Sequence, residues 1–344
     1  MSSPSTTQTD RVQRLESPTV RVGGAETEGL ICAFRLAPYQ ELKLGLAELA
    51  PQRDAPLWLH FNLFDLRGKR WIERSAGLDE DAAALLTGSE NRVRLQMVPG
   101  GFAIVLGDLR YDFDADPEGF HILRVYVDEK LMITCRQQRL TSTDRLRHRL
   151  ERGGVSESTA GVFVSLVEEL VSAFARVSAE LAETVDDAED EILAGQLKHR
   201  AGELGRLRRL LARLRRYVGA NRAALAPLPD RMGTLCDSDQ RQSLREAIDQ
   251  LDAVGQDLDL VTERARLLQE EIAGHLGEAT NRNLYLLSIV TTVLLPITMI
   301  TGVFGMNIGG LPFMKAEHGF GVVMSLMLLA VAGTMLFLRR MRVL

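Results

Sequence analysis

The chain has 344 residues, of which 41 are Lys or Arg and 46 are Asp or Glu, so its formal net charge is −5. This balance excludes a nucleic-acid-binding protein that depends on net basic charge. The charge is unevenly placed, because residues 283–314 and 319–338 contain no charged side chain. Two such spans exclude a purely soluble protein and also a carrier with ten or twelve spans. The sequence therefore predicts a large soluble region followed by a C-terminal membrane hairpin.

The first 28 residues are polar and rich in Ser and Thr, which predicts a disordered tail. They contain no apolar segment of the kind found in secretory signals. The three cysteines, Cys32, Cys135 and Cys236, are far apart and have no CxxC spacing. This spacing argues against a disulfide framework or a thiolate metal site and fits a reducing compartment.

Residues 29–152 predict one α/β domain, because apolar and β-branched segments alternate with polar ones. A short helix with an acidic first turn is expected at 79–88. Pro99-Gly100-Gly101 predicts a hairpin turn between two strands. The expected strands are 29–36, 56–64, 92–98, 101–110, 120–127 and 131–136.

Residues 153–229 change to helical periodicity and predict two long antiparallel helices, at 157–194 and 197–225. Residues 157–195 hold ten acids and one base, net −9, whereas 196–225 hold nine bases and one acid, net +8. This complementarity favours charge pairing within the protein or between its copies over binding of nucleic acid or anionic lipid. The acidic cluster 186–191 is either a divalent-cation site or a solvated helix tip.

A third helix is expected from about residue 238. Its apolar seam continues without a helix breaker as far as Pro296, so a stalk at 238–282 runs directly into the first span. The resulting helix has about 67 residues and is about 100 Å long. The spans at 283–307 and 319–338 are each long enough to cross a bilayer. An outer loop at 308–318 joins them, and residues 339–344 form the C-terminus.

Basic residues flank the cytoplasmic ends of this hairpin. Arg282 precedes the first span, and three arginines lie within 339–344, whereas the loop has only Lys315. The positive-inside rule therefore predicts that both termini lie in the cytoplasm, with the hairpin in the inner (plasma) membrane.

Two helices cannot enclose a pore, so a transporter built from this chain has to form a symmetric oligomer. Hydroxyl side chains recur along the first span at nearly helical spacing and predict a pore-lining face. Alternatively, these hydroxyls serve only to bond back to their own helix. The predicted face comprises Leu284, Ser288, Thr291, Leu295, Thr298 and Gly302, with Asn281 one turn before it.

The first span ends in Gly305-Met306-Asn307. A symmetric oligomer would gather the Asn307 carboxamides into a ring at the outer mouth, where they could bind a metal ion through its water shell. The alternative is an ordinary turn asparagine. The spans contain no His, Cys or carboxylate, which dehydrated Zn²⁺ prefers, so an ion passes hydrated or is captured outside them. Weaker metal candidates are Glu317 and His318 in the outer loop and His275 on the stalk.

The C-terminal hairpin with Tyr285 at its start and Gly305-Met306-Asn307 after the first span resembles the CorA family of divalent-cation transporters. The order of segments covers essentially the whole chain after the tail. The resemblance implies an α+β membrane protein that forms a homopentamer with a cytoplasmic funnel and a pore lined by the first span.

The residues after the tripeptide, Ile308-Gly309-Gly310-Leu311-Pro312, are similar to the zinc-transport, ZntB-like branch of that family. Magnesium-transporting members commonly carry an acid there, and this chain has only Glu317. The resemblance implies Zn²⁺ uptake coupled to protons, with a CorA-type Mg²⁺ or Co²⁺ channel as the alternative. A regulatory cytoplasmic metal site, as in the magnesium branch, would have Asp112, Asp114 and Asp116 as weak candidates.

A function of another class also fits the hairpin, namely a membrane-anchored sensor or scaffold without transport. An enzyme is not expected, because the sequence has no P-loop, catalytic triad or metal-ligand cluster. No cofactor is expected apart from the transported cation. The expected partners are other copies of the chain, membrane lipid and divalent metal ions, and no nucleic acid.

Overall fold

The computed structural model describes residues 28–43, 45–49, 54–111, 120–153, 156–194, 200–306, 312 and 318–340. The predicted tail therefore lies outside the described residues except for its last position. The chain folds into two compact units, the first from residues 1–184 and 207–262 and the second from residues 185–206 and 263–344.

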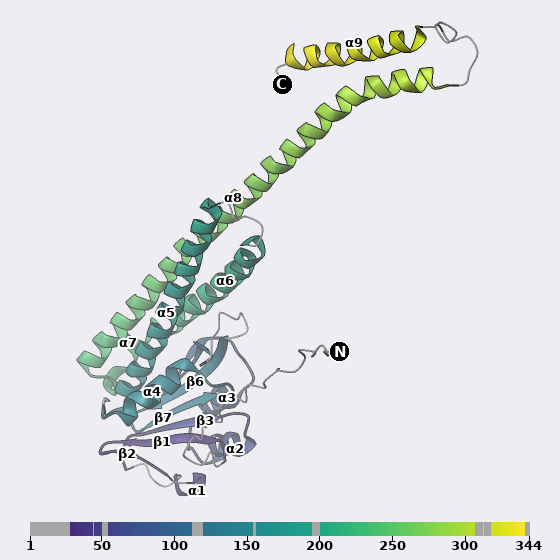
Figure 1. Cartoon of the computed structure of the whole chain (residues 1–344). Helices are drawn as coiled ribbons and strands as arrows, with labels where there is room; N and C mark the ends of the chain where they lie inside the picture. The colour runs from purple at the N-terminus through teal and green to yellow at the C-terminus, as the bar shows by residue number, and fades with distance from the viewer. Residues whose placement is uncertain are drawn as a thin grey trace, which may run out of the picture. The chain divides into compact units, whose positions relative to one another are not determined.

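The first unit contains a mixed seven-stranded sheet in the order β2-β1-β3-β7-β6-β5-β4 (Figure 1). All six predicted strands are present, and the hairpin turn has Gly100 at φ 77°, where Val98 pairs with Gly101. Among the strands of this sheet that the structure describes, β3 and β7 pair in parallel and the other neighbours pair antiparallel. The strands are β1 (Leu30–Leu36), β2 (Tyr39–Glu41), β3 (Leu57–Asn62), β4 (Arg94–Val98), β5 (Gly101–Leu109), β6 (Phe120–Asp128) and β7 (Leu131–Arg136).

Helices cover both faces of the sheet, so every residue of β5 is buried. On one face, Ala103 and Val105 belong to a core shared with α2 (Leu66–Arg74) and α3 (Glu80–Thr87). On the other face, Phe102 contacts Phe163 of α5 (Thr159–Leu193) and β5 meets α4 (Thr141–Glu151). Because side chains alternate along a strand, β5 contributes buried side chains to both faces of the sheet.

Helix α6 (Arg200–Leu225) is fixed to the edge of the sheet beyond the start of β4. The Asn221 side chain accepts a hydrogen bond from Gly107 N and donates one to Gly107 O, both at 2.8 Å. Gly107 lies beyond the part of β5 that pairs with β4. The Asn221 carboxamide therefore makes the two hydrogen bonds that a residue of a neighbouring strand would make. Tyr217 fills the space beside Gly107 and stacks on Phe120, with the ring centroids 5.0 Å apart.

Replacing Gly107 by alanine is expected to destabilise the sheet domain by about 1–3 kcal/mol or more. A Cβ atom there would lie 2.1 Å from Tyr217 Cδ1, so the ring has to move. Both tryptophans of the chain, Trp58 and Trp71, lie in this domain, so denaturant unfolding followed by tryptophan fluorescence measures its stability. Gly202→Ala is the control, because nothing lies within 4 Å of its Cβ. Equal stability of the two variants would contradict the tight contact.

The helical part has α7 (Leu228–Arg231) and a 3-10 turn (Gly233–Leu235) between α6 and the very long α8 (Ser238–Phe304). Helix α8 has 67 residues, which confirms the predicted continuity of the stalk with the first span. Helix α9 (Gly319–Arg340) is the second C-terminal apolar helix. The predicted fold class, an α/β domain, long helices and two C-terminal apolar helices, is thus confirmed.

Helix α8 supplies ion-pair partners to both helices of the predicted charged pair. In the first unit, Arg215 and Arg222 of α6 bind Asp259 and Asp252 of α8 at 2.6 and 2.7 Å. The charge totals of α5 and α6 indicate complementarity, but they do not predict the stalk helix as the partner. These pairs are exposed, so each contributes little alone.

In the second unit, the acidic tip of α5 also pairs with the stalk helix. Arg264 of α8 binds Asp186 at 2.6 Å and Glu189 at 2.8 Å. Two carboxylates of the cluster at 186–191 are therefore occupied by a guanidinium. This arrangement fits an ion-paired helix end and gives the divalent-cation interpretation no support.

Candidate functional site

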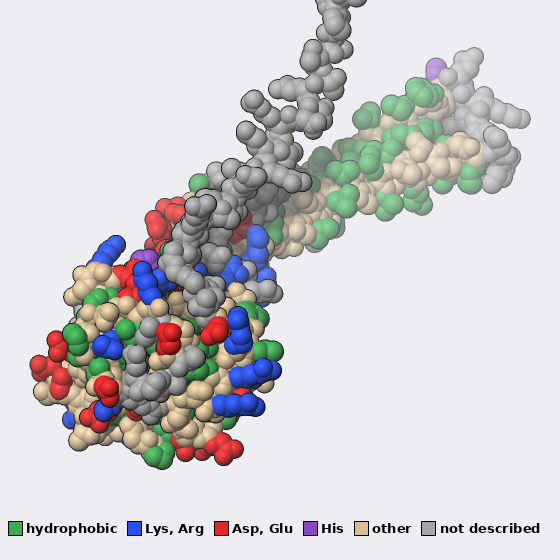
Figure 2. Space-filling model, turned by 90° about the horizontal axis from the view of Figure 1, so that it is seen from below, with side chains coloured by type: hydrophobic (Ala, Val, Ile, Leu, Met, Phe, Trp, Pro, Cys, Tyr) green, Lys and Arg blue, Asp and Glu red, His purple; other side chains and the backbone are tan. Residues whose placement is uncertain are grey.

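Helices α8 and α9 each contain a segment long and apolar enough to cross a membrane. No part of the apolar segment of α8 and only 6% of that of α9 is buried, whereas the core helix of a soluble protein would be mostly buried. Figure 2 shows hydrophobic side chains along the apolar parts of these two helices, whereas most charged side chains visible in this view lie elsewhere on the protein. The hairpin therefore requires lipid or other copies of the chain to cover it.

The apolar half of α8 is half-buried along one side only. The half-buried residues of α8 recur at helical spacing, and those of α9 form a matching row. The row on α8 is Ile289, Val293, Pro296, Ile297, Ile300 and Phe304, and the row on α9 is Val323, Met327, Ala330, Val331 and Thr334.

The predicted pore-lining residues lie mostly on the opposite side of α8, but Thr291 and Leu295 also line a hollow that residues of α9 border. At 100° per residue, the mean direction of the predicted set is about 180° from that of the half-buried row. Leu284 and Leu295 are 55% and 67% exposed, and the remaining members are also exposed. We call this surface, made by Leu284, Ser288, Thr291, Leu295, Thr298 and Gly302 with Asn281 below it, the free face of α8. It is the side of the helix available to an oligomer axis.

The threonine hydroxyls of the free face donate to their own helix. Thr291 Oγ1 bonds Leu287 O at 2.8 Å, and Thr298 Oγ1 bonds Leu294 O at 3.0 Å. The alternative interpretation, in which these hydroxyls bond back to their own helix, therefore holds for the two hydroxyl protons. A hydroxyl oxygen also has two acceptor lone pairs, and those remain outside the helix. The free face therefore offers acceptors, which suit the water ligands of a hydrated cation.

The glycine of the tripeptide has a structural requirement of its own. Gly305 N donates to Thr301 O at 2.8 Å, and Met306 N donates to Val303 O at 3.4 Å, so the last turn closes tightly. A Cβ on Gly305 would lie 2.8 Å from Thr301 O, which is a backbone atom and cannot rotate away. Glycine is therefore needed where α8 ends. Asn307, the third residue of the motif, lies outside the described residues.

The other metal candidates are not brought together among the described residues. His275 Nε2 is 3.8 Å from Glu271 Oε1, and both side chains are about half exposed. His318 is exposed beside a hollow that Phe304 also lines. Within the described ranges, no group of three or more His, Cys, Asp or Glu could hold a metal ion. Glu317 and the acids Asp112, Asp114 and Asp116 lie outside those ranges.

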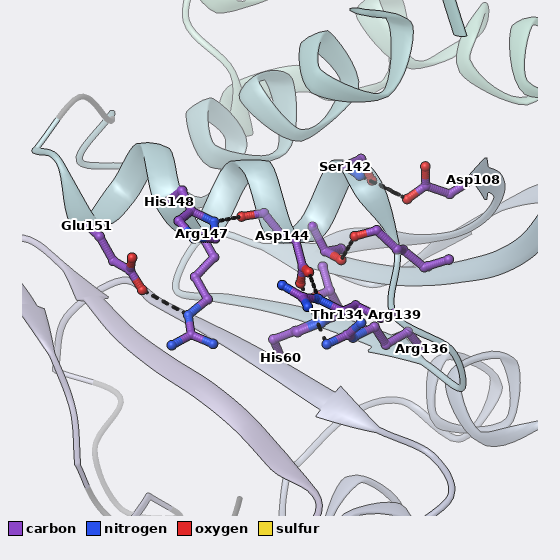
Figure 3. A network of polar contacts seen from close by, with 12 residues as sticks. His60, Asp108, Thr134, Arg136, Arg139, Ser142, Asp144, Arg147, His148 and Glu151 are labelled. Atoms are coloured by element: carbon purple, nitrogen blue, oxygen red, sulfur yellow. Dashed lines mark hydrogen bonds and ion pairs between the residues drawn. The ribbon is translucent and has the colours of Figure 1, made fainter. Parts of the chain in front are cut away.

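Sequence reasoning missed a buried polar network beneath α4 (Figure 3). Asp108 at the end of β5 accepts hydrogen bonds from Leu109 N at 2.7 Å and from the Ser142 hydroxyl and backbone N–H. Asp144 of α4 binds Arg136 at 3.6 Å and also Arg139. The network fixes the first turn of α4 to the sheet. In the sequence, the polar residues 141–144 are the one local feature that indicates a helix start here.

Two groups in the network have strongly shifted ionisation. Burial raises the pKa of Asp108 to about 6, although its hydrogen bonds oppose the shift. Burial lowers the pKa of His60 well below 6.5, so this histidine is neutral, with Nδ1 2.7 Å from Thr134 Oγ1. Both groups lie in the first unit and outside the two apolar helical segments.

The pH dependence of stability is expected to change in Asp108→Asn. Between pH 3.8 and about 6, the folded protein holds a proton on Asp108 that the unfolded chain has released. This carboxyl therefore favours folding at the lower pH, and its contribution is lost as the pH rises through 6. Relative to wild type, the variant should gain up to about 3 kcal/mol between pH 4 and 7.

Denaturant unfolding followed by tryptophan fluorescence at several pH values measures this difference. The matched control is Asp54→Asn at an exposed position. The difference between its free energy of unfolding and that of wild type should not change with pH above pH 5. A flat difference for Asp108→Asn as well would show that the buried carboxyl is ionised throughout the range.

The sequence matches a known protein family over most of its length. The family model described as "CorA-like Mg2+ transporter protein" matches residues 53–340. The chain therefore belongs to the CorA-like family of divalent metal cation transporters.

Among curated relatives, the zinc transport protein ZntB of Pectobacterium atrosepticum is 29% identical over 287 residues, which is 83% of this chain and 88% of that protein. The zinc transport protein ZntB of Yersinia enterocolitica is 27% identical over 301 residues, covering 86% of this chain and 92% of that protein.

Solved structures give the same architecture. The full-length CmaX protein has a TM-score of 0.77 and 28% identity, over 93% of this chain and 99% of that one. The CorA magnesium transporter of Methanocaldococcus jannaschii has a TM-score of 0.73 and 17% identity, over 90% and 97% of the two chains, and it supports the fold alone.

Proposed function

We propose that this chain is a homopentameric transporter that carries Zn²⁺ into the cytoplasm through a central pore. The free face of α8 lines the pore, and a ring of Asn307 side chains selects the ion at its outer mouth. The observation that supports this most is the free face itself, which is exposed, carries hydroxyl acceptors and lies largely opposite the half-buried row of α8. A simple membrane anchor has no need for such a face.

The choice of Zn²⁺ follows from the curated ZntB relatives, which span most of the chain. The side chains of the spans indicate how the ion travels. Neutral hydroxyl and carboxamide oxygens can accept hydrogen bonds from the water shell of an ion, whereas dehydrated Zn²⁺ prefers His, Cys and carboxylate ligands. We therefore propose that the ion crosses the described part of the pore hydrated. The same chemistry would accept Mg²⁺, which the family description names, or Co²⁺, and a Mg²⁺ or Co²⁺ channel is the second candidate function.

The protein is proposed to lie in the inner membrane with both termini in the cytoplasm. The arginines at the end of α9 and Arg282 before the first span support this orientation. The acidic residues of the stalk would then concentrate cations on the cytoplasmic side. Uptake is proposed to be coupled to a proton gradient.

The purified oligomer in liposomes tests these proposals together. Flux of Zn²⁺, Mg²⁺, Co²⁺ and Ni²⁺ is measured with dyes inside the vesicles, with and without a pH gradient. We expect Zn²⁺ flux that exceeds Mg²⁺ flux and rises when the outside is more acidic. Greater Mg²⁺ flux would favour the second candidate, and flux independent of the gradient would remove proton coupling. The absence of flux for every metal would indicate a membrane-anchored sensor or scaffold.

Leu284→Ser is expected to raise leak flux severalfold, because Leu284 lies at the cytoplasmic end of the free face. A ring of leucines forms an apolar neck that resists wetting, and a ring of serines does not. The control is Leu286→Ser, the same change on nearly the opposite side of the helix. The measurement is the basal metal flux into liposomes in the absence of a pH gradient. An unchanged leak in Leu284→Ser, or an equal one in both variants, would contradict a neck at this level.

A further inference from the structure

A cavity of about 660 Å³ lies in the first unit, far along the chain from the spans. It opens between the start of β4, at the free edge of the sheet, and the last turns of α6. Four arginines line it, Arg92 and Arg94 from the strand side and Arg216 and Arg231 from the helical side. Nothing in the proposed transport path uses this site.

The walls of the cavity are held in place by buried contacts. Arg124, which is 1% exposed, donates to Glu90 O at 3.1 Å and to Asn91 Oδ1 at 3.0 Å, and thereby fixes the segment before β4. Asn221 fixes α6 to Gly107 on the other side. The cavity is therefore a built feature of the sheet edge, and its shape does not depend on a flexible surface loop.

Positive charge in the cavity exceeds negative charge. Arg94 pairs with Glu90. Arg92, Arg216 and Arg231 have no acidic partner among the described residues, and the Arg216 guanidinium lies 5.8 Å from the centre of the Tyr217 ring. Elsewhere on α6, by contrast, Arg215 and Arg222 are each paired with an aspartate of α8. Three guanidinium groups at one hollow therefore remain available to an anion.

The floor of the cavity is apolar. Val93 and Leu95 contribute from the strand side, and Pro227 lies beyond the end of α6. Small side chains, Ala220, Ala223 and Ala224, face the hollow from α6 and leave room for a flat group. A ligand that uses the whole site must therefore combine several anionic oxygens with an apolar ring system. The volume is within the range of small-molecule sites.

We propose that this cavity binds a nucleoside di- or triphosphate. The planar guanidinium forks of Arg92, Arg216 and Arg231 would bind the phosphate oxygens, for which arginine is the best-suited side chain. The base would lie on the apolar floor, and Asn91 would offer a carboxamide to its polar edge. Inorganic phosphate would satisfy the charges but leave the floor uncovered, so it should bind more weakly.

The position of the cavity gives bound nucleotide a route to the transport helix. Arg216 and Tyr217 lie on the same helix as Arg215 and Arg222, which bind α8 within this unit. Helix α8 continues into the first span. A ligand that draws Arg216 toward its phosphates would act on the α6–α8 contact, so the site is suited to regulation.

The test is binding of a fluorescent ADP analogue to the full-length oligomer in detergent, without added metal, followed by anisotropy. ADP, ATP, adenosine and inorganic phosphate are then used as competitors. We expect ADP and ATP to compete, and adenosine and phosphate to compete at least tenfold more weakly. Arg92→Ala and Arg231→Ala should each raise the dissociation constant about tenfold or more. Ala223→Glu, which places a carboxylate at an exposed position of the cavity, should do the same without removing an arginine.

The matched control is Arg70→Ala, which removes an exposed arginine from α2 of the same domain. Its dissociation constant should equal that of wild type. The absence of nucleotide binding at millimolar concentration, or equal weakening in Arg70→Ala, would overturn the proposal. Competition by phosphate as strong as that by ADP would also overturn it, in favour of a simple phosphate site. A change of oligomeric state in Arg231→Ala with no nucleotide binding to wild type would identify the arginines as contacts between copies. None of these outcomes depends on transport, so this proposal and the proposed function can fail separately.

Discussion

Asn307→Ala is expected to lower metal flux by about one to three orders of magnitude. In a symmetric pore, each copy contributes one carboxamide, whose oxygen accepts from the water shell of the ion and whose amide donates to neighbouring backbone. The loss of about three water-mediated contacts, each contributing roughly 0.5–1.5 kcal/mol, accounts for this range. Flux in liposomes and metal binding by the purified oligomer are measured for the same preparations.

Two further variants make the result specific. Asn307→Asp should bind cations more tightly and release them more slowly, because conduction requires an ion to leave as well as to enter. Asn283→Ala removes the same side chain near the other end of the span and should leave flux unchanged. Wild-type flux in Asn307→Ala, with intact oligomers, would contradict the selectivity ring and return attention to the sensor or scaffold hypothesis.

The fold was largely predictable because its signals are local. The apolar seam that enters the first span without a breaker predicts a single helix, and α8 has 67 residues. Alternating apolar segments predict six of the seven strands, whereas β2 has only three residues, all exposed. Helix α2 was missed because it is short and polar. Its start is fixed by Asp65, which accepts a hydrogen bond from Arg67 N at 2.9 Å.

Contacts between distant residues could not be predicted in this way. Gly107 and Asn221 are 114 positions apart, and nothing in either local sequence indicates that a carboxamide completes the sheet edge. The same holds for the cavity, whose arginines come from segments more than a hundred residues apart. The charge totals of α5 and α6 predict attraction, but the choice of α8 as the partner depends on how three helices pack. The pore itself requires several chains, and so its residues remain a prediction.

Replacing both Thr291 and Thr298 by valine is expected to lower flux by about 5- to 150-fold while the oligomer stays assembled. Valine keeps the branched shape and the helical rotamer, so the main change is the loss of two hydroxyls in every copy. These hydroxyls offer lone pairs on the free face, while their protons are bound to Leu287 O and Leu294 O. Two contacts of roughly 0.5–1.5 kcal/mol each give the expected range.

The control for this pair is Thr334→Val on α9. Thr334 also donates to its own helix, to Ala330 O at 2.8 Å, but it belongs to the half-buried row of α9 and lies across a shared hollow from Thr291. If the hydroxyls act only through helix geometry, all of these threonines should matter alike. If they line the pore, only the pair on the free face should lower flux. Equal losses would therefore assign the threonines to helix packing, and wild-type flux in the double variant would remove Thr291 and Thr298 from the conduction path.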